Sequence, residues 1–283
     1  CFFILKYILK GIFLSVLSYV LSLCPTVFSA KPLGIALCCS AQTNCLFIFS
    51  GCLLSVLSHK QTESLAFLFV YLFIIASRAV ISKWLCDREE YSKIFSEPYS
   101  VGIFLSVISA FFIGLYVCFS ESFSLFSLGS LLVYIVVSSG MSFLFDGIYE
   151  KGEENDSFRY LLALSAYAFC LVLAASKYSI FGYTLGFSVA CAVSVYSAYK
   201  FGVLQSGMIA LLAGTACSEP ALAPMYAIIA LSCSAIRRIK NKYAIPVSLL
   251  LGSAYAFIVF GQKALTYIIP DTAGGLVLLI PFY

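Results

Sequence analysis

Two carboxylates stand where they could do chemistry. Glu219 opens an apolar run in Ser218-Glu219-Pro220, and Asp271 lies inside the apolar stretch IIPDTAGGLVLL. An acidic side chain inside a membrane segment can bind a proton or an ion, so both are candidate intramembrane carboxylates. A serine or aspartate beside a proline also suits a helix start, where it caps free amides and complements the helix dipole. We favour capping, with Asp271 capping a helix break, and keep ion coupling as the alternative.

The cysteines and the histidine add little chemistry. The 12 cysteines include no CxxC pair, which argues against a zinc or disulfide framework. Cys38, Cys45 and Cys52 recur every seven residues, and we interpret them as a packing seam on one helix face rather than a metal or redox site. His59 is the only histidine, and no GxxxxGK[ST], GxSxG or HExxH motif occurs. We expect no catalytic residue, metal or cofactor in this segment, and we expect that the segment is not an enzyme.

The elements that would position these residues are membrane helices. Hydrophobic residues make up 62% of the 283 residues and charged residues only 11%, whereas soluble domains carry about 25% charged residues. The net charge of +4 is spread over short connections, which is typical of a topology signal and not of nucleic-acid binding. The composition predicts a membrane protein whose main partner is the lipid bilayer.

Apolar runs long enough to cross a bilayer, about 20 residues each, divide the chain. We expect helices at 7–23, 33–57, 64–82, 99–119, 122–145, 158–176, 179–198, 201–216, 219–236, 243–260 and 263–282. The stretch 33–57 is interrupted by SAQTN at 40–44, which favours two short helices or a re-entrant pair. The predicted fold is all-α, a polytopic transmembrane bundle of about ten helices that forms one multi-pass domain over 1–283.

Basic residues in three connections predict the orientation. They lie between Lys83 and Lys93, between Lys151 and Arg159, and in a third group that we interpret as a cytoplasmic anchor: Arg237, Arg238, Lys240 and Lys242. Even numbers of expected segments separate the groups, so all three, and the C-terminus at Tyr283, should face the cytoplasm. The third group could instead bind anionic headgroups or a cytoplasmic partner. Arg78 can snorkel to the interface.

Small residues predict a closely packed helical hairpin. Gly207 and Gly214 lie two turns apart in one expected helix, and Tyr226, Ala230 and Ser234 follow at helical spacing in the next. Small side chains at such intervals let two membrane helices approach closely. These five residues are the expected helix-packing positions.

The spacing of two stretches resembles a known family. Pro32-Leu33-Gly34-Ile35-Ala36 resembles the Pro-Phe-Gly-x-Ala element of the stage II sporulation protein E family, with Leu33 in place of Phe. Tyr226-Ala227, Ala230, Ser234 and Arg237 fall where that family has Tyr-Ala, Gly, Gly and Arg, and the run ending at Pro281 is similar to its last membrane segment. The resemblance extends over nearly the whole chain in architecture.

The resemblance implies a membrane region of about ten helices, followed by a regulatory segment and a manganese-dependent 2C-type serine/threonine phosphatase domain. That enzyme dephosphorylates an anti-anti-sigma factor and so activates the forespore sigma factor. This chain would then anchor the enzyme, bind copies of itself and cell-division and septal proteins, and localise to the polar septum. Cys1 in place of Met predicts a piece of a longer protein, with the phosphatase after Tyr283. The alternative is a small secondary transporter that couples through Glu219 or Asp271.

Overall fold

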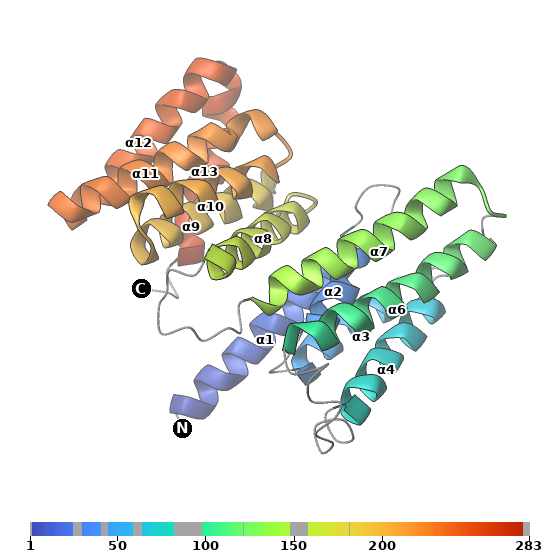
Figure 1. The fold of residues 1–283 in the computed structure, drawn as a ribbon. Coiled ribbons are helices and arrows are strands. Elements are labelled where there is room, and N and C mark those ends of the chain that lie inside the picture. The colour runs from blue at the N-terminus through green and yellow to red at the C-terminus, as the bar shows by residue number, and fades with distance from the viewer. Residues whose placement is uncertain are drawn as a thin grey trace. The chain divides into compact units, whose positions relative to one another are not determined.

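The chain forms two compact units, unit 1 over residues 1–153 and unit 2 over residues 154–283. The computed structural model describes residues 2–24, 30–40, 45–58, 64–81, 98–120, 122–147, 158–180 and 182–279, traced in Figure 1. Twelve α-helices make up most of these described residues, so the predicted all-α class is confirmed. The basic residues from Lys83 to Lys93, Lys151, His59, Pro281 and Tyr283 lie outside them, as do the side chains of Lys6 and Lys10.

Unit 1 contains six helices within the residues described. They are α1 (Phe2–Leu23), α2 (Pro32–Ser40), α3 (Cys45–Ser58), α4 (Ser64–Val80), α6 (Pro98–Ser120) and α7 (Leu125–Asp146). The stretch 33–57 is therefore two helices, α2 and α3, as the interruption at SAQTN predicted. Cys38 and Cys52 consequently lie on different helices, so the expected single cysteine face is wrong.

The short helix α2 is the centre of unit 1. All nine of its residues are buried, and it packs against α1, α3, α4, α6 and α7. Two contacts with α7 fix its start: the Lys31 amide donates to Tyr134 Oη at 3.2 Å, and Ser138 Oγ donates to the Pro32 carbonyl at 3.3 Å. Its end is held by Arg78 of α4, which donates through Nη2 to the Cys39 carbonyl.

Unit 2 begins with α8 (Phe158–Ala175), which leads into a small hairpin of β1 (Ser179–Ile180) and β2 (Tyr183–Thr184). The strands pair Ser179 with Thr184 and Ile180 with Tyr183. The remaining elements are α9 (Leu185–Lys200), α10 (Val203–Thr215), the 3-10 helix η3 (Pro220–Leu222), α11 (Ala223–Ile239), α12 (Asn241–Phe260), the π-helix η4 (Ala264–Ile268) and α13 (Ile269–Leu279).

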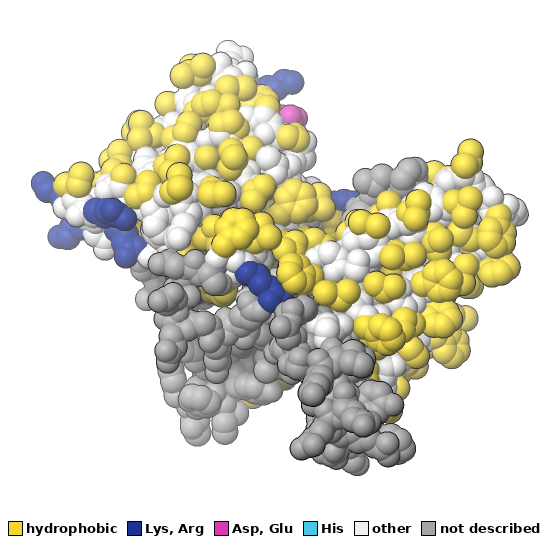
Figure 2. Space-filling model, in the orientation of Figure 1, with side chains coloured by type: hydrophobic (Ala, Val, Ile, Leu, Met, Phe, Trp, Pro, Cys, Tyr) yellow, Lys and Arg dark blue, Asp and Glu magenta, His cyan; other side chains and the backbone are white. Residues whose placement is uncertain are grey.

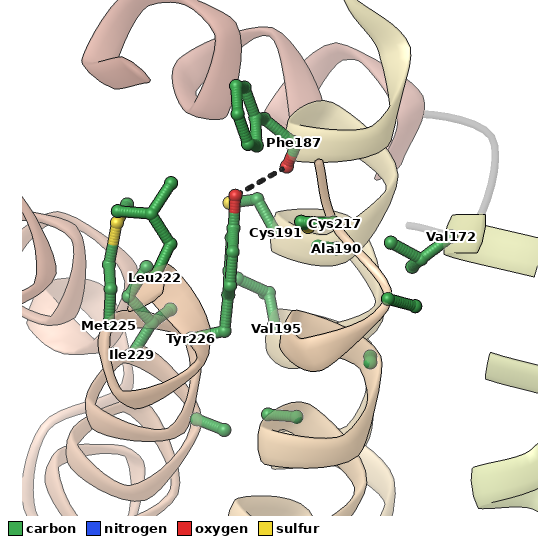
Figure 3. Close-up of a cluster of buried hydrophobic side chains, with 14 of the residues drawn as sticks. Val172, Phe187, Ala190, Cys191, Val195, Cys217, Leu222, Met225, Tyr226 and Ile229 are labelled. Carbon is green, nitrogen blue, oxygen red and sulfur yellow. Dashed lines mark hydrogen bonds between the residues drawn. The ribbon is translucent and has the colours of Figure 1, made fainter. Parts of the chain in front are cut away.

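Helix α9 is the element around which unit 2 is built. It packs against α8, α10, α11 and α13, and its buried residues join those of α10 and α11 in one hydrophobic cluster. Figure 3 shows part of that cluster, with Phe187, Cys191 and Val195 of α9 beside Met225, Tyr226 and Ile229 of α11. With 16 residues α9 is about 24 Å long, somewhat short of a bilayer core.

Five helices in the described residues are long and apolar enough to cross a membrane. They comprise residues Ser100–Ser120, Leu125–Asp146, Phe158–Ala175, Pro220–Ile239 and Asn241–Phe260. Shorter apolar segments occur at Gly11–Leu23, Cys45–Ser58, Leu65–Val80 and Val203–Thr215. These apolar helices indicate a membrane protein; the ten spans stay a prediction.

Several helices bury their small residues and expose their large apolar residues. The buried residues of α12 are Ala244, Ser248, Gly252 and Ala256, one in every four. The same helix exposes Val247, Leu250, Leu251, Phe257 and Ile258. Helix α7 repeats the pattern with buried serines, exposed leucines and an exposed valine, Val136. Figure 2 accordingly shows yellow hydrophobic side chains over the visible face of each unit.

Candidate functional site

A carboxylate from another helix closes the N-terminal end of α9. Thr184 is the N-cap residue, and its side chain makes no capping hydrogen bond. Its backbone amide instead donates to Asp271 Oδ2 of α13 at 2.8 Å. Asp271 is 4% exposed and Thr184 is half-buried, so this bond is partly buried. A carboxylate in this place satisfies a free amide and complements the positive end of the helix dipole.

Asp271 does not stand at a helix break. The π-helix η4 runs directly into α13, and Asp271 lies in the first turn of α13. The expected break is therefore wrong, because the chain accommodates Pro270 without ending the helix. Proline lacks an amide hydrogen and its ring crowds the carbonyl four residues earlier, that of Thr266. The wider π turn covers that position.

The two glycines after Asp271 serve helix packing. A Cβ added at Gly275 would lie 2.2 Å from the Ser188 carbonyl oxygen of α9, and one at Gly274 would lie 3.1 Å from Ser188 Oγ. Ser188 Oγ also donates to the Asp271 carbonyl at 2.5 Å. The backbones of α9 and α13 therefore meet closely beside the carboxylate, which fixes its position.

An arginine from another helix closes the C-terminal end of α9. Arg237 of α11 donates through Nη1 to the Tyr199 carbonyl and, at 3.3 Å, to the Ala198 carbonyl. Its Cζ lies 4.9 Å from the centroid of the Tyr199 ring, a cation–π contact. The last carbonyls of a helix have no partner within it, and a cation there complements the negative end of the dipole. Arg237 thus contacts α9, which its place in a basic run did not reveal.

The α10–α11 hairpin contains the expected packing residues. A Cβ at Gly207 would lie 2.6 Å from Leu231 Cδ2, and one at Gly214 would lie 2.7 Å from Ala223 Cα. Tyr226 is fully buried, and its hydroxyl donates to the Phe187 carbonyl at 3.4 Å, drawn as a dashed line in Figure 3. The structure therefore places both glycines against α11.

The inner face of α11 continues through Ala230 and Ser234, which are 0% and 4% exposed. Ala230 belongs to the cluster shared with α9. On the α12 side, a Cβ at Gly252 would lie 2.5 Å from Ile229 Cγ1. Helix α11 is consequently packed closely on both sides, by glycines of α10 and of α12.

All four cations of the third basic group are exposed: Arg237, Arg238, Lys240 and Lys242. Figure 2 shows Lys and Arg side chains gathered where α11 ends and α12 begins. The Tyr160 ring at the start of α8 lies 6.4 Å from the Phe201 ring that follows α9. Together with the Arg237 contact, this brings the start of α8, the end of α9 and the end of α11 to one end of unit 2.

Glu219 lies at the opposite end of α11. It is exposed, it precedes η3 as its N-cap residue, and its side chain makes no capping hydrogen bond. Its backbone carbonyl accepts from the Leu222 amide at 3.0 Å. The capping expected from Ser218 is also absent at this helix start. Nearby, burial raises the pKa of the Cys217 thiol to about 12, although Tyr226 opposes the shift.

Sequence reasoning missed three groups that hold the helices together. The four-residue repeat of small residues in α12 was visible and could have been found by a search for such spacings. The partners of Arg78 and Asp271 had no local signal, because Cys39 and Thr184 lie far away along the chain. In the part of the chain that the structure describes, no three His, Cys, Asp or Glu side chains are placed to hold a metal ion.

The fold and the site together define an all-α protein of membrane type, in which a buried carboxylate and an exposed arginine close the two ends of α9. No known family, no curated protein and no solved structure matches the chain.

Proposed function

We propose that this chain is a multi-pass membrane domain that anchors an attached cytoplasmic part and assembles with copies of itself. The observation that carries the proposal is the side-chain distribution on α12, where Ala244, Ser248, Gly252 and Ala256 are buried and large apolar residues are exposed. A helix on the surface of a soluble protein has the reverse arrangement. In a bilayer, helices associate through close packing of small residues while apolar side chains contact lipid.

The proposed topology has about ten spans and a cytoplasmic C-terminus. In unit 2 the topology is supported by the positions of the basic residues. The start of α8, the end of α9 and the end of α11 meet at one end of the unit, and these helix ends contain Arg159, Lys200 and the group from Arg237 to Lys242. The other end holds the exposed Glu219. Lys and Arg concentrate in cytoplasmic connections, so we assign the basic end to the cytoplasm.

Reporter fusions test this topology. A cytoplasmically active fluorescent protein and an alkaline phosphatase that is active only outside would each be inserted after Ser218 and after Lys240. We expect phosphatase activity from the first position and fluorescence from the second. The same reporter active at both positions, or recovery of the fusions in the soluble fraction, would refute the multi-pass proposal. Co-purification of two differently tagged copies tests self-assembly.

The more specific proposal is that the anchored part is a sporulation phosphatase at the polar septum, which activates the forespore sigma factor. Its support is the resemblance in Pro32 to Ala36 and at Tyr226, Ala230, Ser234 and Arg237. These positions are used in packing: α2 is wholly buried, and Ala230 and Ser234 lie on the inner face of α11. Manganese and the catalytic residues would belong to the following domain. A stop codon or an unrelated domain after Tyr283 would refute this proposal and leave the membrane topology standing.

A secondary transporter is the second candidate, because buried Asp271 lies three residues after the π-helix η4, and π-helical turns are often found at functional sites. The contact with Thr184 gives this carboxylate a structural role without any transport. Replacing Asp271 with Asn and Glu219 with Gln separates the two. Unchanged septal localisation and sporulation in both variants would remove the transporter's best residues.

A further inference from the structure

Two thiols face each other in the centre of unit 1. Cys38 Sγ of α2 lies 3.3 Å from Cys52 Sγ of α3, and both are free thiols in buried positions. A disulfide joins sulfurs about 2.05 Å apart, so closing this pair requires an approach of about 1.2 Å. A small rotation of the two side chains can supply a movement of this size.

Hydrogen-bond donors converge on the sulfur of Cys52. The Cys38 thiol donates to it at 3.3 Å, and Ser22 Oγ of α1 lies 3.1 Å from it, although the Ser22 hydroxyl also donates to the Ser18 carbonyl at 2.7 Å. The hydroxyl of Tyr71 of α4 in turn donates to Ser22 Oγ at 3.4 Å. A thiolate is the attacking species in disulfide chemistry. A thiolate at Cys52 would accept from Cys38 and, once the Ser22 hydroxyl turns from the Ser18 carbonyl, from Ser22.

The surrounding backbone holds the pair in register. A Cβ at Gly34 of α2 would lie 2.4 Å from Ser22 Oγ and 2.5 Å from Tyr71 Oη. One at Gly51, next to Cys52, would lie 2.0 Å from the Ser15 carbonyl of α1. Helices α1, α2 and α3 therefore meet at closest approach around the thiols. Groups fixed in this way react as if present at very high concentration.

We propose that Cys38 and Cys52 form a redox-active dithiol that a disulfide-bearing oxidant converts into a bond between α2 and α3. Cys52 attacks one sulfur of the oxidant and breaks its disulfide, and the released thiolate takes up the Cys52 proton. Cys38 then attacks the Cys52 sulfur of the mixed disulfide, and the second released thiolate takes up the Cys38 proton. Two protein thiols and one disulfide become one protein disulfide and two small thiols.

Disulfide mapping on the full chain in native membranes tests the proposal. The probe is 2,2′-dithiodipyridine, a small apolar disulfide; remaining thiols are blocked with N-ethylmaleimide, and peptides are mapped by mass spectrometry. We expect Cys38–Cys52 to be the main intrachain disulfide once Cys52 is oxidised, because the second thiol already lies 3.3 Å away, and we expect dithiothreitol to reverse it. Cys38→Ser and Cys52→Ser should abolish it, whereas Cys24→Ser and Cys45→Ser should retain it.

The same mapping after denaturation in sodium dodecyl sulfate shows whether the preference for Cys38–Cys52 depends on the fold or only on the spacing of the cysteines along the chain. In an unfolded chain, shorter loops close more readily, so Cys45 should compete for both partners and the preference should disappear. Free Cys38 and Cys52 in the folded, oxidised sample would overturn the proposal. So would a dominant link through Cys45 in native membranes. The mapping of the unaltered chain decides the question even if a serine variant fails to fold.

Discussion

Substitution of Asp271 measures how much the carboxylate stabilises the N-terminal end of α9. In Asp271→Ala the amide of half-buried Thr184 loses its acceptor, the carboxylate oxygen of buried Asp271 at 2.8 Å. An unsatisfied buried amide costs about 1–3 kcal/mol, and the lost charge at the helix end adds about 1 kcal/mol. Asp271→Asn retains an oxygen acceptor and loses only the charge. We expect destabilisation of about 2–4 kcal/mol for Ala and about 1 kcal/mol for Asn.

The comparison has an internal control, because the bond from Ser188 Oγ goes to the backbone carbonyl of Asp271 and persists in both variants. Glu219→Ala is the matched control, since this carboxylate is exposed and makes no cap bond. Unfolding of the purified protein in detergent by increasing sodium dodecyl sulfate, followed by circular dichroism, gives the free energies. The reasoning fails if Asp271→Asn destabilises as much as Asp271→Ala, or if Asp271→Ala behaves like Glu219→Ala.

Three further predictions use the same unfolding assay or a labelling assay. Gly275→Ala places a Cβ 2.2 Å from a backbone oxygen of α9 and should lower the free energy of unfolding by about 2 kcal/mol or more. The control is Gly140→Ala, where the new Cβ has nothing within 4 Å, and it should stabilise the protein by up to about 1 kcal/mol. Equal effects of the two substitutions would contradict the packing of α13 against α9. Arg237→Gln removes the positive charge at the end of α9 and should cost about 1 kcal/mol, whereas Arg238→Gln should change nothing measurable. Cys217, whose pKa of about 12 keeps the thiol protonated at pH 8, should react with maleimide only after denaturation; rapid labelling of the folded protein would refute its burial.

Much of the helix arrangement could be predicted from local patterns. Apolar runs separated by polar residues placed most of the helices within a few residues, and SAQTN correctly divided 33–57 into α2 and α3. The helix expected at 179–198 is wrong at its start, because the strands β1 and β2 come first and α9 begins at Leu185. The glycines of α10 could be identified because small residues at helical spacing permit close approach. These features depend only on residues close together along the chain, so they can be recognised in the sequence.

The partners of the polar groups that join the helices could not be predicted in this way. Asp271 meets Thr184, Arg237 meets Tyr199, and Cys38 meets Cys52 only because particular helices are neighbours. Hydropathy does not choose among neighbours, since every apolar face satisfies lipid equally well. A helix end buried inside a bundle must still find partners for its amides and carbonyls.

The sequence by itself determined that the chain is all-α, apolar enough for a membrane and basic where α11 ends. Only the tertiary structure decided that Asp271 and Arg237 close opposite ends of one helix, and that two cysteines of different helices meet within 3.3 Å. The physical reason is that burial and helix length follow from residue type and local spacing. Which free amide meets which carboxylate follows from packing, and packing is fixed only when all the helices are in place.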